Sequence, residues 1–232
     1  VDNGNLVASL WSLKQGLLDA TRSPLLPSGL LRGLIEAVKL VRDSGYIGRR
    51  PLSALTRLPQ SDCEWIAAVV ALPETWLETS GSPRKSYSDE ADWWLTEIRH
   101  RRQAICDAVE QFAPWLLPEF SAVRKLRKLE LQSSLKKLIP NQAGSFYQQL
   151  DRQLQEAGKV ETNEQVVQEI YRLRDRLPEC KRAMAALVQK LQESADAADA
   201  LATEMNFEMV YDSRRRLLTV GYDVGAQRED KS

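Results

Sequence analysis

The sequence contains few of the residues that build metal sites and nucleophilic triads. His100 is the only histidine, and Cys63, Cys106 and Cys180 stand far apart in the chain. Zinc sites take several closely spaced ligands of these kinds, and a Ser-His-Asp triad needs a histidine beside its serine. His100 lies in the charged run Arg99–Arg102, which is typical of a solvated helix face. We therefore expect reduced, buried cysteines, no metal and no cofactor. Any catalytic or binding chemistry would depend on carboxylates, hydroxyls and amides, and these groups are suited to binding sugars.

The chain also lacks an excess of charge and a long apolar run. Lysine plus arginine number 32 and aspartate plus glutamate number 32, so no net field favours nucleic acid or anionic lipid. The longest apolar stretch, Trp65–Leu72, is far shorter than the ~20 residues of a membrane-spanning helix. Val1–Asn5 resembles no secretory signal and has no initiator methionine. These features predict a soluble fragment without nucleic-acid binding or membrane insertion.

A glycine-rich phosphate loop is absent as well. Gly4 and Asn5 lack the preceding strand and the further glycines of a nucleotide site. The hydrophobic content of 43% is nevertheless sufficient for a buried core, so we expect one large domain or two small ones.

Apolar residues recur at helical spacing along most of the chain. Leu6, Leu10, Leu13 and Leu17 form one stripe and predict a first helix over 6–20. Proline, glycine and capping residues predict where the other helices begin and end. These helices cover 30–41 with Gly45 as C-cap, 61–77 with a capping box at Ser61 and Glu64 and an end or kink at Pro73, 86–112 with a capping box at Ser86 and Asp89, 126–138 ended by Pro140, 146–157 closed by Gly158, and a last helix capped by Thr162 and Gln165.

The last predicted helix has the spacing of a coiled-coil seam. Its apolar residues recur at intervals of four and three, and the alanines among them imply close helix packing. Such a seam serves either oligomerisation or packing against a neighbouring helix of the same domain, and we favour the second. The seam consists of Met184, Val188, Leu191, Ala195, Ala198, Ala202 and Met205.

The apolar period changes to that of a strand after Asn206, which predicts one β-hairpin. The alternating residues are Phe207, Met209 and Tyr211 before the polar stretch 212–216, and Leu218, Val220 and Tyr222 after it.

Six tryptophans are compatible with either a sugar platform or a core. Their helical spacing favours the core, with at most one or two at a cleft. They are Trp11, Trp65, Trp76, Trp93, Trp94 and Trp115.

Both ends of the chain resemble one enzyme family. The start, Val1–Leu6 before an apolar helix, resembles the Val-Asp-Ser-Gly-Asn-Leu segment in the glycoamylase-like region of cyclic β-1,2-glucan synthases, with Asn3 in place of the commoner serine. The helical middle resembles that family only weakly. The end is similar to the family's hairpin at Phe207, Tyr211–Asp212, Arg215–Leu217 and Gly221–Tyr222. It is also similar to the residues that precede a Tyr-Tyr-Asp-Leu-Leu stretch in that family, at Arg228, Asp230 and Ser232.

The resemblance implies an all-α fold in which helical hairpins form part of an (α/α) toroid. Residues 1–80 would supply its first helices, 86–205 a long helical insertion or scaffold, and 206–232 the hairpin that leads into the rest. The linker-like stretch Gly81–Lys85 is the predicted boundary between the first two.

The resemblance also implies a function in the processing or cyclisation of β-1,2-linked glucan. The parent would be a membrane-bound glycosyltransferase or glycoside-hydrolase-like enzyme, with this segment on the cytoplasmic side of the bacterial inner membrane. Expected partners are a β-glucan oligosaccharide or polysaccharide and the other domains of the parent. The isolated chain is expected to be inactive.

Two groups of polar and aromatic residues are candidates for sugar contacts. Asp2, Asn3 and Asn5, ahead of the first helix, either cap that helix or bind sugar hydroxyls. Their chemistry alone favours capping, whereas the family resemblance favours sugar binding. The two tyrosines near the carboxyl end offer either a sugar-stacking face or core packing. The predicted substrate-binding residues are Asp2, Asn3, Asn5, Tyr211, Asp212, Tyr222 and Asp230.

Glycoside chemistry normally needs two carboxyl groups that face one cleft, and sequence spacing does not identify such a pair. No catalytic residue is therefore assigned among Asp2, Asp212, Asp223, Glu229 and Asp230. The long heptad segment supports an alternative function, a non-catalytic helical scaffold or interaction module.

Overall fold

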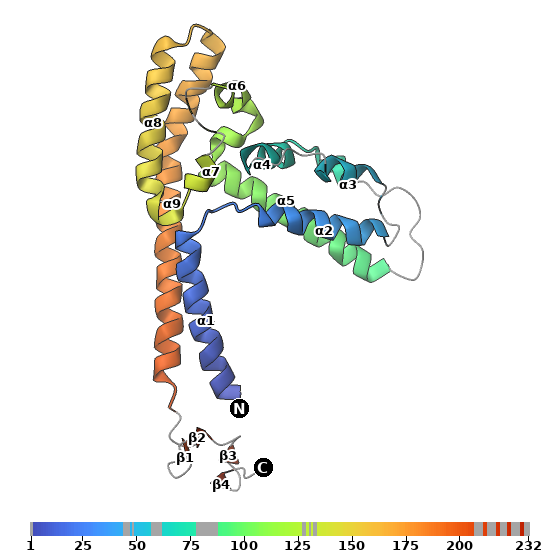
Figure 1. Cartoon of the computed structure of the whole chain (residues 1–232), viewed down its shortest axis with the longest axis vertical. Coiled ribbons are helices and arrows are strands. Elements are labelled where there is room, and N and C mark those ends of the chain that lie inside the picture. The colour runs from blue at the N-terminus through green and yellow to red at the C-terminus, as the bar shows by residue number, and fades with distance from the viewer. Residues whose placement is uncertain are drawn as a thin grey trace. The chain divides into compact units, whose positions relative to one another are not determined.

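The computed structural model describes residues 2–43, 47, 49–56, 62–77, 88–126, 129, 131, 134–206, 211–212, 217–218, 222–223 and 228–229. The predicted all-α class is confirmed for this part of the chain (Figure 1). The chain divides into two compact units. We call Val1–Arg22 with Leu187–Ser232 the terminal unit, and Ser23–Ala186 the central unit.

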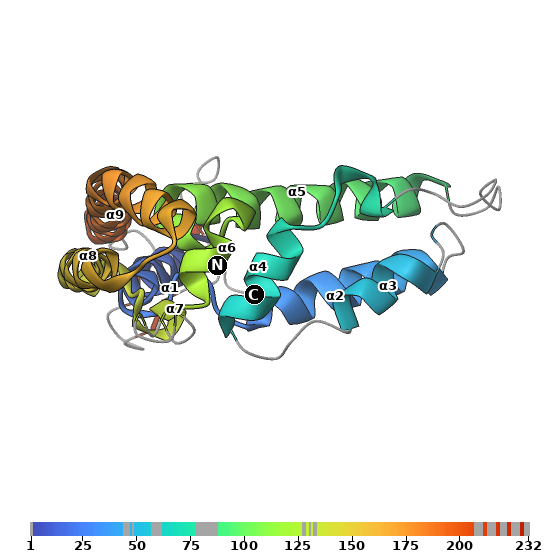
Figure 2. The same cartoon turned by 90° about the horizontal axis from the view of Figure 1, so that it is seen from above.

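The central unit begins with a group of packed helices. Helix α2 (Gly29–Asp43) packs on α5 (Ser88–Phe112) and on α3 (Arg49–Thr56), and α4 (Asp62–Val70) packs on α5. Figure 2 shows α2 and α5 running side by side. The predicted helix over 30–41 is confirmed, whereas α3 had no counterpart in the prediction.

Helical periodicity explains the core of this group. On α2, Leu34, Val38 and Val41 are buried, as their spacing predicts. On α5, four apolar residues at helical spacing are buried, and Trp94 is half-buried. The four buried residues are Ile98, Ile105, Val109 and Phe112. Helix α4 ends at Val70, just before Pro73, as predicted, and a 3₁₀ turn, η1, follows over Glu74–Leu77.

The segment after α5 consists of short turns. They are η2 (Pro114–Leu116), η3 (Pro118–Phe120), α6 (Ser121–Arg124), α7 (Ser134–Lys137) and η6 (Pro140–Gln142). The prediction of one helix over 126–138 is therefore wrong. Leu129 and Leu131 are both buried, although residues two apart lie about 200° apart on a helix, so a single helix with one buried face cannot bury both. The backbone N–H of Leu25 donates to the carbonyl of Leu138 at 3.1 Å and joins this segment to the start of α2.

Helix α8 (Ala143–Val160) and the first part of α9 (Glu164–Glu204) form an antiparallel hairpin (Figure 1). Arg174 Nε donates to Asp151 Oδ1 at 2.7 Å between them. Two predicted ends need correction. Gly158 lies inside α8, not at its end. The cap of α9 is Asn163, not Thr162, because Asn163 Oδ1 accepts the backbone N–H of Gln165 at 3.0 Å.

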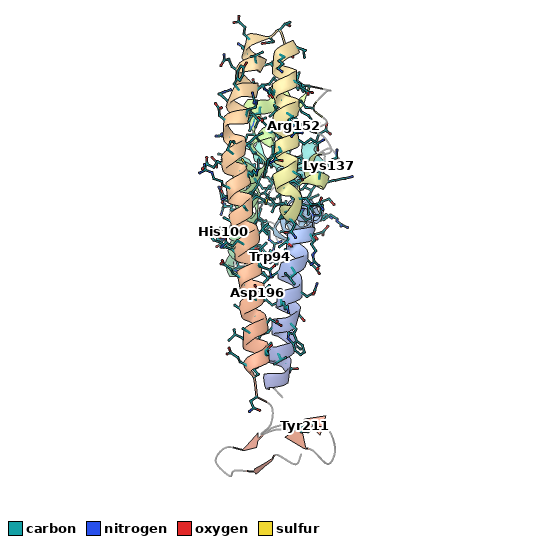
Figure 3. The ribbon with its side chains drawn as sticks, turned by 90° about the vertical axis from the view of Figure 1, so that its left-hand side faces the viewer. Trp94, His100, Lys137, Arg152, Asp196 and Tyr211 are labelled. Carbon is teal, nitrogen blue, oxygen red and sulfur yellow. The ribbon has the colours of Figure 1, made fainter. Side chains whose placement is uncertain are left out.

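The terminal unit contains α1 (Asp2–Arg22) and the part of α9 from Leu187 onward. The two helices run antiparallel and side by side (Figures 1 and 3). Lys14 Nζ and Asp199 Oδ2 form an ion pair at 2.8 Å. The seam residues Ala195, Ala198 and Ala202 are buried, so the seam packs within the chain as predicted. Its partner is α1, from the opposite end of the sequence.

The terminal unit also contains two antiparallel pairs of two-residue strands. Strand β1 (Tyr211–Asp212) pairs with β2 (Leu217–Leu218), with Tyr211 opposite Leu218, across the predicted turn. Strand β3 (Tyr222–Asp223) pairs with β4 (Arg228–Glu229). The sequence predicted one hairpin, and the structure contains two such pairs.

The structure gives no evidence for the toroid. Neither unit contains a closed ring of helix pairs among the described residues. Gly45, Ser61, Gly81–Lys85 and Ser86 lie outside the described residues, so the caps and the boundary predicted there stay predictions.

Within the described part of the chain, no helix has both the length and the apolar content needed to cross a membrane.

Candidate functional site

The first turn of α1 contains three of the predicted sugar-binding residues. The helix begins at Asp2, so Asp2, Asn3 and Asn5 lie within its first turn. A negative charge near a helix N-terminus is favourable because the first N–H groups have no intrahelical partner. The side chain of Asn5 is exposed and therefore free to meet a ligand.

The strand pairs contain three more of the predicted residues. Tyr211 is 48% exposed, so the core-packing interpretation is wrong for this tyrosine. Asp212 is opposite Leu217, and Tyr222 is opposite Glu229. Asp230 lies outside the described residues.

These candidates come from the two ends of the sequence and belong to one compact unit. Val1–Arg22 and Leu187–Ser232 cluster together, and the long intervening segment forms the other unit. The fold therefore assigns the first turn of α1 and the strand pairs to the same part of the molecule.

Trp11 is a further candidate, since the sequence leaves one or two tryptophans for a cleft without identifying them. Its side chain is 55% exposed. At 100° per residue, Trp11 lies roughly 100–160° from the four leucines of the α1 stripe, and this offset is the sequence signal that it lies away from the stripe. Lys14 and Gln15 follow it by three and four residues, so they lie on its face of the helix. Gln15 Nε2 donates to Asp19 Oδ1 at 3.0 Å, so an exposed indole stands beside amide and charged groups.

The remaining tryptophans divide between core and surface. Trp65 and Trp115 are fully buried, as predicted, and Trp76 and Trp94 are half-buried. Trp93 of α5 is 58% exposed, so Trp11 and Trp93 are the tryptophans that lie outside the core among the described side chains.

The charged run around His100 is mostly a solvated helix face, as its sequence predicts. His100, labelled in Figure 3, is exposed, as are Arg99 and Arg101. Arg102 is the exception, since it is half-buried and its Nη2 donates to the carbonyl of Leu72. This arginine therefore joins α5 to the end of α4.

The two cysteines whose side chains are described are unpaired thiols. Cys180 is buried, and burial raises the pKa of its thiol to about 11. Cys106 is half-buried, and burial raises its pKa as well. A thiol with a raised pKa stays protonated near neutral pH and is a poor nucleophile. Among the described residues, no three histidine, cysteine, aspartate or glutamate side chains are grouped to hold a metal ion.

Two hollows in the described part of the central unit contain no predicted site residue. One lies beside α8, has a volume of about 20 Å³, and holds no more than a water molecule. It is lined by Leu129, Leu131, Lys137, Phe146, Gln149, Leu150 and Gln153. The other is an open surface at the turn between α8 and α9, with Glu161, Gln165 and Arg172 among its residues.

No protein-family model, curated protein or solved structure matches this chain.

Proposed function

We propose that the terminal unit is a glucan-contacting part of an enzyme of the cyclic β-1,2-glucan synthase type. One observation carries the proposal. The two sequence segments that resemble this family, near Val1–Leu6 and within 207–232, belong to the same compact unit. A resemblance divided between the two ends would have little meaning if those ends belonged to separate units.

The exposed side chains of this unit suit a sugar ligand. A pyranose ring presents apolar C–H faces that stack on aromatic rings and hydroxyls that bind amides and carboxylates. Trp11 and Tyr211 are half-exposed aromatics, and Asn5 is an exposed amide. Asp2, Asn3, Asp212, Tyr222 and Asp230 complete the proposed set of sugar contacts.

In this proposal the central unit is a helical scaffold inserted between the two family-like segments. It has its own buried core, centred on residues such as Trp65 and Trp115, and the two hollows described above are too small or too open for a glucan site. The carboxyl pair, the rest of an (α/α) toroid and the attachment to the cytoplasmic face of a membrane belong to other parts of the parent enzyme. The buried core equally favours a second candidate function for the whole chain, a non-catalytic scaffold.

Two equally exposed tryptophans provide a matched test. Trp11 belongs to the terminal unit and Trp93 to the central unit, with exposed fractions of 55% and 58%. We expect Trp11→Ala to weaken the binding of linear β-1,2-glucooligosaccharides by about tenfold, roughly 1.4 kcal/mol, and Trp93→Ala to leave it unchanged. Isothermal titration of both variants measures this difference. An equal effect of the two substitutions, or no binding by the unsubstituted chain, would contradict the proposal and favour the scaffold.

A further inference from the structure

The terminal unit has an apolar surface that its own two helices do not cover. On α1, Leu6 and Leu13 are 47% and 53% exposed, and Leu201 of α9 is 55% exposed. Val7 and Thr21 of α1 are buried, so the helix packs through a face beside the predicted leucine stripe. The leucine stripe of α1 is therefore only partly buried by contacts within the chain.

Helical geometry places these three leucines on one side of the helix pair. At 100° per residue, Leu6 and Leu13 lie about 90° from the packing face of α1. Leu201 lies about 90° from the face that carries Ala195, Ala198 and Ala202, in the same rotational sense. Because the helices run antiparallel, offsets of the same sense point to the same side of the pair (Figure 1). Together they form a continuous surface, which we call the leucine face.

The charges of the leucine face lie at its ends and edge. On this side of α1 the residues between Leu6 and Ala20 are leucine, serine and alanine, and Asp2 is a charged residue in the first turn. On α9, the corresponding row is Lys190, Ser194, Ala197, Leu201 and Met205, with one charge at its end and Glu204 about 60° to one side. The centre of the face is uncharged, so two copies can meet there without burying like charges.

We propose that the leucine face is a homodimer interface, where two copies form an antiparallel four-helix bundle. A two-fold axis parallel to the helices brings α1 of one copy against α9 of the other, so all neighbouring helices are antiparallel. This axis preserves height along the helices, and Lys14 is level with Asp199, so Leu13 of one copy meets Leu201 of the other, while Leu17 meets the small side chains around Ala197.

The area of the leucine face is sufficient for an interface with a second copy of the chain. Helix α1 has 21 residues, hence a length of about 30 Å, and a pair of helices is about 20 Å wide. Two such faces bury roughly 600 Å² each, or about 1,200 Å² together, which is the lower limit for a specific interface. A dimer of micromolar affinity is the expected result. The inference does not depend on glucan binding.

Sedimentation equilibrium of the full chain tests the dimer. We expect a mass near twice 26.3 kDa at concentrations of about 100 μM, with dissociation on dilution. Leu13→Glu and Leu201→Glu should each weaken the dimer at least about 100-fold, because a charge would be buried in the interface. Leu40→Glu is the matched control, since Leu40 of α2 is 51% exposed but lies in the central unit, and it should leave the dimer intact.

Circular dichroism of all variants checks that the helices are retained, as expected for substitutions at exposed positions. A mass of 26.3 kDa at every concentration would overturn the proposal. Dimerisation that survives both substitutions would overturn it too, as would a monomer that captures an added amphipathic leucine-rich peptide on the same face.

Discussion

The two units differ in what they bury. The central unit buries large side chains such as Trp65, Trp115 and Phe120, all below 2% exposure. The packing face of α9 in the terminal unit buries three alanines, and leucines beside it stay half-exposed. Hydrophobic stabilisation scales with the apolar area removed from water, at about 25 cal/mol per Å². The central unit is thus built for stability, whereas the terminal unit keeps apolar and aromatic surface for contacts with other molecules.

The largest effect should come from the core of the central unit. Trp115 is fully buried, and its ring lies 5.5 Å from that of Phe146. We expect Trp115→Ala to lower the free energy of unfolding by about 3–5 kcal/mol, because it leaves a large cavity. Urea unfolding measures this, and Trp93→Ala is the exposed control, with an expected change below about 0.5 kcal/mol. Similar losses in the two variants would contradict the assignment of the core.

The next effect is a loss of stability at alkaline pH that originates in the central unit. Burial raises the pKa of Cys180 from 9.0 to about 11. A raised folded-state pKa means that the unfolded chain releases its proton first, so stability is complete below pH 9 and falls as the pH rises towards about 11. Burial also raises the pKa of Tyr147, whose hydroxyl donates to the carbonyl of Phe112 at 2.8 Å, and this adds a loss that begins above pH 10.

Unfolding experiments on Cys180→Ala isolate the cysteine contribution. Each pKa unit corresponds to about 1.4 kcal/mol, so the unsubstituted chain should lose on the order of 2 kcal/mol more than the variant near pH 10.5. An identical pH dependence in both proteins would show that the thiol is accessible to water.

The smallest effect should come from the ion pair of the terminal unit. Lys14 and Asp199 are separated by 2.8 Å, and their side chains are 33% and 42% exposed. A double-mutant cycle with alanine at both positions should give a coupling energy of only about 0.2–1 kcal/mol, because water and salt screen exposed pairs. A coupling above about 2 kcal/mol would mean that the terminal unit is held together by this pair and not by its alanine seam.

The sequence predicted the buried face correctly for those helices that have a single apolar stripe. The stripes of α2 and α5 and the alanine seam of α9 are buried where their spacing placed them. The leucine stripe of α1 did not identify the packing face, because Val7 and Thr21 lie on a neighbouring face and the position of the partner helix decides which face is buried. The segment containing Leu129 and Leu131 was mispredicted because its leucines are buried by tertiary packing and not by one helix face.

The candidate site was predictable only in part. The resemblance at the two ends led to Asn5 and Tyr211, both of which are exposed. Trp11 was missed because exposure depends on which side of α1 meets α9, and a stripe pattern read along one helix does not contain that information. The association of the two ends in one unit was likewise invisible, since residues separated by most of the chain leave no local signal.

The central claim is that the terminal unit, and not the central unit, contacts glucan. Amide hydrogen exchange of the full chain with and without linear β-1,2-glucan tests it most directly, because binding slows exchange in the elements that it stabilises. We predict slower exchange within 2–22 and 187–206 and unchanged exchange within 23–186. Protection confined to 23–186, or no change anywhere at saturating glucan, would contradict the account.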